Sequence, residues 1–194
     1  MPWWASGGRV ALWLDVAVKV ATVALLVLAV LFPTWPQFQG KAFVGRAIGY
    51  PVALMVLPVI WWLVGRRKVP FPAAVDVLLG LPFLIDMAGN AANLYDSVTW
   101  WDDANHFVNW GLHTAGIGLL LRATGLASPI LFGLGVAWAS TTAIVWELAE
   151  YIAFVPNSPE AATAYEDTLG DLALGMAGGT LAAALVGWWA ARRA

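Results

Sequence analysis

The stretch VALWLDVAVKVATVALLVLAVLF, residues 10–32, decides the fold because it is apolar at almost every position. An α-helix rises about 1.5 Å per residue, so about 20 such residues cross the hydrocarbon core of a bilayer. The run is longer than the apolar core of a signal peptide, and no Ala-x-Ala exit follows it. We therefore expect a retained membrane span, which Pro33 and Pro36 close.

The composition of the whole chain supports a lipid environment. Of its 194 residues, 61% are hydrophobic and 11% are charged, whereas a soluble domain has about 25% charged residues. The net charge of −2 leaves no basic face for nucleic acid. Cysteine is absent, which excludes disulfides and thiolate chemistry.

Five further apolar segments have the length that a membrane span needs. We expect an all-α integral membrane protein in which residues 1–194 form a single domain, a compact bundle of six transmembrane helices. Pro51, Pro58 and Pro82 fall inside expected spans and predict kinks there. The expected spans are about 10–32, 47–65, 72–95, 103–121, 128–154 and 168–191.

The positions of lysine and arginine predict the orientation, since cytoplasmic loops carry an excess of both. The connection between spans two and three holds RRK (66–68), and the carboxyl end holds RR (192–193). Both termini are therefore expected in the cytoplasm, as in a multi-pass protein of a bacterial-type cytoplasmic (inner) membrane. Lys41 and Arg46, in the first connection, oppose this orientation.

Polar side chains gather at the ends of spans three to six that this orientation places outside. Along spans three and four they recur at helical spacing on one face. Ionised groups are costly in lipid and normally face one another or a wet cavity, so four helices predict one shared extracytoplasmic pocket. Its expected members are Asp86, Asn90 and Asn93; Asp102, His106, Asn109 and His113; Glu147, Glu150 and Tyr151; and Asp167, Thr168 and Asp171.

The carboxylates of this pocket outnumber the nearby basic groups, which are limited to Lys41 and Arg46. Unpaired carboxylates in a low dielectric either take up protons or acquire a counter-cation. Carboxylates with imidazole and no sulfur are ligands for zinc, manganese or iron, and carboxylates alone favour magnesium or calcium. We expect a divalent metal ion. Its expected ligands are Asp102, His106, Glu147 and Asp171, and the expected general base is Glu150 or Asp167.

Three motifs follow one another along spans four to six: WDDANHF (101–107), WELAEY (146–151) and YEDTLGDLALGMAGG (165–179). Their order, together with DMAGN (86–90), resembles the VanZ-like superfamily and more closely the YjdF-type inner-membrane proteins, a family of unknown function. VanZ-like proteins commonly have glutamine where Glu150 stands and asparagine where Gly175 stands, so the antibiotic resistance associated with VanZ relatives is not carried over. The resemblance implies a motif set and no particular reaction.

Simpler explanations apply to several of these residues. Asp102 is also a favoured helix N-cap, and Asp103 is equally typical of a solvated loop. His113 is typical of a hydrogen-bonded interior imidazole as well as of a ligand. Trp138 and Trp146, within span five, fit core packing as well as a pocket wall.

Two acidic residues lie away from the pocket. Asp15 and Lys19 stand four residues apart in span one and predict a local ion pair near the cytoplasmic end. Asp76, in span three, has no partner that the sequence identifies.

Two classes of function fit these expectations. The first is a metal-dependent hydrolase or transferase acting on an envelope lipid or a lipid-linked substrate, in which the metal ion activates water. The lack of arginine around the site argues against a phosphate-bearing substrate. The alternative is a small proton- or cation-coupled transporter, or a lipid-binding envelope factor without catalysis. A carrier needs access from both faces, however, and the expected polar groups lie on one side. A third reading is a structural subunit whose polar cluster pairs with another membrane protein.

Overall fold

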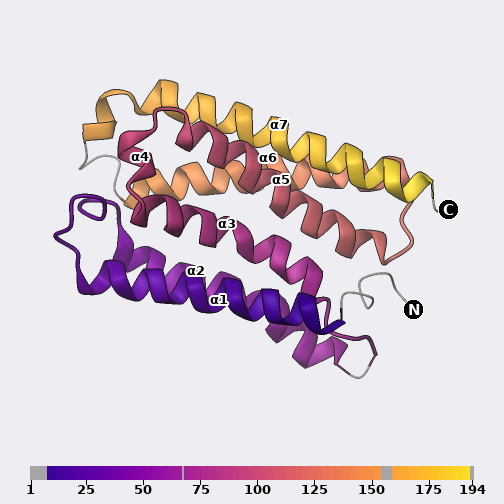
Figure 1. The fold of residues 1–194 in the computed structure, drawn as a ribbon. Helices are drawn as coiled ribbons and strands as arrows, with labels where there is room; N and C mark the ends of the chain where they lie inside the picture. The colour runs from indigo at the N-terminus through magenta and orange to yellow at the C-terminus, as the bar shows by residue number, and fades with distance from the viewer. Residues whose placement is uncertain (1–7, 67, 154–158, 193–194) are drawn as a thin grey trace.

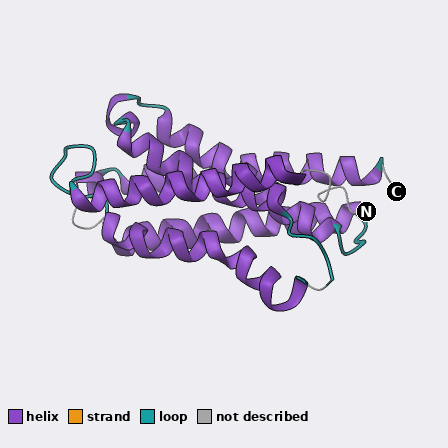
Figure 2. Ribbon diagram, turned by 60° about the horizontal axis from the view of Figure 1, so that its bottom comes forward, coloured by secondary structure: helices purple, strands orange, loops and turns teal. Residues whose placement is uncertain are grey.

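The computed structural model describes residues 8–66, 68–153 and 159–192, and these residues contain helices and no strand (Figure 1, Figure 2). The expectation of an all-α chain is confirmed for them. The helices are α1 (Gly8–Leu31), α2 (Phe43–Ile60), α3 (Ala73–Ala91), α4 (Leu94–Ser97), α5 (Trp101–Arg122), α6 (Ser128–Ala153) and α7 (Ala164–Ala191). A π-helical turn (Trp61–Gly65) continues α2, and a 3-10 turn (Pro159–Ala162) precedes α7.

Five helices are long and apolar enough to cross a membrane: α1, α2 with its π turn, α3, α6 and α7. Each coincides with an expected span to within a few residues. The remaining expected span, 103–121, corresponds to α5, which is 22 residues long but opens with the polar sequence DDANH (102–106). Large apolar side chains such as Val44, Val52 and Leu148 are exposed on the outside of the helices, as lipid contact requires.

The long helices form two layers of three (Figure 1). In one layer α3 packs against α1, with α2 beside both, and in the other α7 packs against α5 and α6. The layers are joined mainly through α3 and α5, so that α2 and α6 stand on either side of the junction without packing extensively against each other. The start of α1 and the end of α7 lie at the same end of the bundle (Figure 1).

Two glycines allow α5 to approach its neighbours closely. A Cβ atom on Gly178 of α7 would lie 1.9 Å from the carbonyl oxygen of Phe107, so only glycine fits at this crossing. A Cβ atom on Gly116 of α5 would lie 2.7 Å from the Leu79 side chain of α3. The close crossing of α5 and α7 brings the polar faces of both helices together, as the small residues of GMAGG (175–179) predict.

A buried ionic cluster lies towards the end of the bundle where α1 begins. The Lys19 ammonium donates to Asp15 at 2.5 Å, which confirms the ion pair expected within span one. It also donates to Asp76 of α3, so Asp76 has the partner that the sequence did not identify. One lysine therefore ties α1 to α3.

Candidate functional site

A cavity of about 640 Å³ lies between α2, α3, α5 and α6, towards the opposite end of the bundle. Its lining combines polar side chains with aromatic and aliphatic ones. The polar lining comprises Arg46, Tyr50, Asp86, Tyr95, Asn105, His106, Asn109, His113, Thr142 and Glu150. The apolar lining includes Phe83, Trp110, Trp138, Val145 and Trp146.

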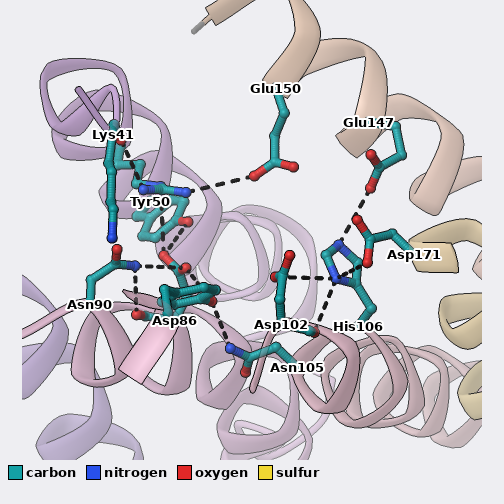
Figure 3. Close-up of polar contacts among 12 residues, drawn as sticks. Lys41, Tyr50, Asp86, Asn90, Asp102, Asn105, His106, Glu147, Glu150 and Asp171 are labelled. Atoms are coloured by element: carbon teal, nitrogen blue, oxygen red, sulfur yellow. Dashed lines mark hydrogen bonds and ion pairs between the residues drawn. The ribbon is translucent and has the colours of Figure 1, made fainter. Parts of the chain in front are cut away.

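His106 is the centre of a buried cluster built from α5, α6 and α7 (Figure 3). Its Nδ1 atom lies 2.9 Å from Asp171 Oδ1, within hydrogen-bonding distance. Its Nε2 atom lies 3.4 Å from Glu147 Oε1. Asp102, one turn earlier on α5, places its carbonyl oxygen 3.2 Å and its Oδ1 atom 3.5 Å from Nδ1. Three carboxylates from three helices thus surround one imidazole.

The Glu147 carboxylate is the least satisfied member of this cluster. Its Oε1 atom is buried and has no hydrogen-bond partner among the described residues. Ligand atoms of His106, Glu147 and Glu150 lie within 4.8 Å of one another, and so do those of Asp102, His106 and Asp171. The cluster therefore contains two candidate metal-binding triplets that share His106.

A second network surrounds Asp86 at the end of α3. Its carboxylate accepts hydrogen bonds from Tyr50 at 2.7 Å, from Tyr95 at 2.8 Å and from Asn90 at 3.1 Å. The Nε atom of Arg46 stands 3.6 Å away. Burial and the Asp86 carboxylate raise the pKa of the Tyr95 hydroxyl well above its usual value, so Tyr95 remains a donor.

Arg46 connects the two networks. Its Nη2 atom lies 3.6 Å from Glu150 Oε1, across the cavity from α2 to α6. Asn105 extends the Asp86 network along α5, because its side-chain amide donates to the Tyr95 hydroxyl at 2.6 Å and accepts from Asn109 at 3.3 Å. The carboxylates expected to share one pocket thus form two networks. Asp86 and Glu150 line the cavity with His106, whereas Asp102, Glu147 and Asp171 are not among its lining residues.

Some expected pocket residues lie elsewhere. Helix α3 ends at Ala91, so Asn93 falls in an exposed left-handed turn (φ 59°) and does not share a face with Asp86. Tyr151 is 59% exposed, because adjacent residues on a helix point about 100° apart and Glu150 takes the inward direction.

Three further polar residues lie outside the cavity lining. On α7, Asp167 is exposed and Thr168 is half-buried. Asp103 is exposed, in agreement with its simpler explanation as a solvated residue.

Other expected residues line the cavity. His113 lies between the rings of Phe83 and Trp110, with centroid distances of 5.6 and 5.8 Å. The His113 imidazole packs against these two aromatic rings and makes no hydrogen bond within the described part of the chain. Asn109 leaves its Oδ1 atom buried and unpaired.

Sequence reasoning did not assign Arg46, Tyr50, Tyr95 or Asn105 to the pocket. Arg46 was expected only as a nearby basic residue, but it lines the cavity and pairs with two of its carboxylates, so the objection that the site lacks arginine is wrong. The expected second span began at residue 47, which left Arg46 in a loop, whereas α2 begins at Phe43. If the second span had been expected to begin before residue 46, the spacing of Arg46 and Tyr50, one helical turn apart, would have placed both on one helix face.

Comparison with known proteins places the chain in a family. No curated protein and no solved structure matches it. A family model described as a predicted membrane protein (DUF2238) matches residues 16–192, a range that includes the whole site. The chain is therefore a multi-pass integral membrane protein, and it belongs to the DUF2238 family of predicted membrane proteins.

Proposed function

We propose that this protein is a metal-dependent hydrolase or transferase that acts on a membrane lipid or a lipid-linked substrate, with its reaction centre at His106. The observation that carries the proposal is the pair formed by His106 Nε2 and the buried, unpaired Glu147 Oε1, 3.4 Å apart. A buried carboxylate oxygen without a hydrogen bond is costly, and a cation between it and the imidazole would satisfy both.

The geometry of this pair fits a zinc-like ion. Nitrogen and oxygen ligands lie about 2.0–2.1 Å from zinc, so two ligands of a tetrahedral site are about 3.3–3.4 Å apart. Glu150 supplies a third ligand atom close to the other two. On the far side of the ring, the Asp171 carboxylate lies 2.9 Å from Nδ1, and metal-bound histidines usually donate their second ring N–H to a carboxylate or a backbone carbonyl.

This arrangement refines the roles expected from the sequence. His106, Glu147 and Glu150 become the ligands, while Asp171 and Asp102 position the imidazole from its Nδ1 side. His106 and Glu150 line the cavity, so a remaining coordination position would face a substrate there. A bound metal ion lowers the pKa of a coordinated water to about 7, which makes hydroxide available without a separate base.

The proposal includes the membrane topology. Helix α5, packed between α3 and α7, serves as the remaining span, because Asn105, His106 and Thr114 are buried against its neighbours rather than exposed to lipid. Lys41 and Arg46 lie on the outer side in this topology, but the RRK (66–68) and RR (192–193) segments outnumber them and favour cytoplasmic termini. The reaction centre then faces the outside of a bacterial-type inner membrane.

Elemental analysis of the purified protein tests the metal centre. We expect about one divalent ion per chain, as at a mononuclear zinc site, and its loss in His106→Ala and Glu147→Gln. Asp103→Asn is the matched control, because this exposed carboxylate lies on α5 near His106 without contacting it. A wild-type protein that contains no metal and takes up neither zinc nor manganese would refute the proposal.

One observation favours a proton- or cation-coupled transporter as a second candidate. The Asp15–Lys19–Asp76 cluster borders another cavity, of about 440 Å³, in the opposite half of the bundle. Ionisable groups therefore occur in both halves of the membrane domain, as a proton or cation path requires. Cation-dependent flux in liposomes that is lost in Asp76→Asn would support the transporter. If the wild-type protein shows no such flux, the transporter is excluded and the hydrolase or transferase remains.

A further inference from the structure

Helices α2 and α6 present small residues to the cavity. These are Gly45, Gly49 and Ala53 on α2, at intervals of four, and Ala149 and Ala153 on α6. Small residues at this spacing normally allow two membrane helices to pack closely. Here α2 packs against α1 and α3, α6 packs against α5 and α7, and the cavity lies between the two small-residue faces.

The space beside these faces is open. A Cβ atom built on Gly45 or on Gly49 meets no atom within 4 Å. Helices α2 and α6 are also the least buried of the five candidate spans, with 11% and 22% of their apolar windows buried against 28–50% for the others. The gap between them therefore faces the lipid of a bilayer.

Only side chains cross the gap at its polar end. Arg46 of α2 faces Glu150 of α6 at 3.6 Å, and the rings of Tyr50 and Trp146 lie 6.2 Å apart. Among the described residues these side-chain contacts span the gap, so a lateral opening at this end would require Arg46, Tyr50 and Trp146 to move.

Arg46 has donors to spare for an anionic ligand. A guanidinium carries five N–H groups, and the only hydrogen bond that Arg46 donates within the described chain goes from Nη1 to the Lys41 carbonyl at 2.8 Å. Its Nε and Nη2 atoms stand 3.6 Å from carboxylates, beyond the usual limit of about 3.2 Å. A planar fork with free donors matches a phosphate group.

Two residues of the cavity lining also carry unpaired polar atoms. The Nε1 atom of Trp138 and the Oδ1 atom of Asn109 are buried without a hydrogen-bond partner among the residues described. A donor and an acceptor of this kind suit the ester and hydroxyl groups of a glycerolipid. The aromatic wall of Phe83 and Trp110 continues from them and suits an acyl chain.

We infer that a phosphate-bearing lipid enters sideways between α2 and α6, with its phosphate on Arg46 and the start of an acyl chain along the aromatic wall. This inference rests on the proposed function, because it names the substrate class of the same centre. A divalent ion at His106 and Glu147 would offset the negative charge of the surrounding carboxylates and complete a clamp on the phosphate.

Photolabelling of the full-length protein tests the lateral opening. The probe is phosphatidic acid with a diazirine in its acyl chain, and labelled residues are mapped by mass spectrometry. Gly49→Leu places a side chain where a Cβ atom meets no atom within 4 Å, and it is expected to reduce labelling of cavity residues about tenfold, equivalent to about 1.4 kcal/mol. Gly133→Leu on α6 is the matched control, since its Cβ also meets no atom within 4 Å and it does not line the cavity. Equal labelling in Gly49→Leu and wild type would overturn the inference.

The role of Arg46 is tested with the same probe and with the matching diacylglycerol, which lacks the phosphate. Arg46→Lys keeps the positive charge but loses the planar guanidinium with its paired N–H donors. We expect the preference for phosphatidic acid over diacylglycerol to fall about tenfold. An unchanged preference would overturn the assignment of Arg46. Complete displacement of the lipid by inorganic phosphate would identify a site for free phosphate and overturn the lipid assignment.

Metal analysis of the same samples separates this inference from the proposed function. Gly49→Leu leaves every candidate metal ligand in place, so we expect it to retain the ion while it loses the lipid label. Bound metal without cavity labelling in the wild-type protein would refute the lipid site alone. Cavity labelling without bound metal would refute the hydrolase and leave a lipid-binding protein.

Discussion

Carboxylates are buried in both halves of the bundle, with different partners. Where α1 begins, Asp15 and Asp76 both contact Lys19. In the other half three carboxylates surround His106, and no lysine reaches them. An ammonium group is a fixed cation with three donors, whereas an imidazole has two ring nitrogens and binds metals. The comparison indicates that the Lys19 cluster already contains its own cation, whereas the carboxylates around His106 have no lysine partner among the described residues.

The largest effect is expected from Lys19→Met. This change leaves two carboxylates buried without their cation, and breaking a buried ion pair costs about 3–5 kcal/mol. The free energy of unfolding in detergent measures it. The control combines Lys19→Met with Asp15→Asn and Asp76→Asn, which removes the charges together and should recover most of the loss. If Lys19→Met alone is as stable as wild type, the Lys19 cluster carries no net ion pair, and the contrast between the Lys19 and His106 clusters is wrong.

Asp171→Asn should act on metal affinity more than on the fold. Asparagine keeps the shape but loses the negative acceptor that orients His106, and changes to such partners weaken metal binding about 10–100-fold, or about 1.4–2.7 kcal/mol. Titration against a metal-binding dye gives the affinity. Asp76→Asn, in the other cluster, should leave it unchanged. Equal weakening by both variants would mean that the two clusters are not distinct.

Tyr95→Phe should cost about 1.5 kcal/mol of stability at pH 7, because it removes a hydrogen bond to the Asp86 carboxylate. The pKa of Tyr95 is raised in the folded protein, whereas an unfolded tyrosine ionises near about 10. Above that pH the unfolded state releases a proton that the folded state retains, so the contribution of Tyr95 falls as pH rises. The difference between wild type and Tyr95→Phe should therefore shrink above about pH 10. A difference that grows with pH would contradict this assignment.

Lys41→Ala should have the smallest effect. Lys41 contacts the Asp96 carboxylate at 2.9 Å, but the Asp96 side chain is 46% exposed, and pairs of this kind contribute about 1 kcal/mol or less. Unfolding at low and high salt measures it, and the effect should be smaller at high salt. A loss as large as that of Lys19→Met would show that exposure does not separate the ion pairs of this protein.

Much of the fold follows from apolar run length alone, since each expected span coincides with a helix. The spacing of Asp102 and His106 also placed two members of the site correctly on one face of a helix. Which nitrogen of His106 faces Glu147 depends on how α5, α6 and α7 rotate against one another, and no single helix encodes that rotation. Arg46 was missed for a different reason, because polar residues at a helix start lower the hydropathy that marks a span.

The seam between the two layers has a mechanical consequence. Gly116 meets the Leu79 side chain where α5 crosses α3, and neither residue lines the cavity. A side chain at position 116 would first have to displace the Leu79 side chain, because its Cβ atom would lie 2.7 Å away. The fit between the two layers therefore depends on a contact that lies outside the cavity.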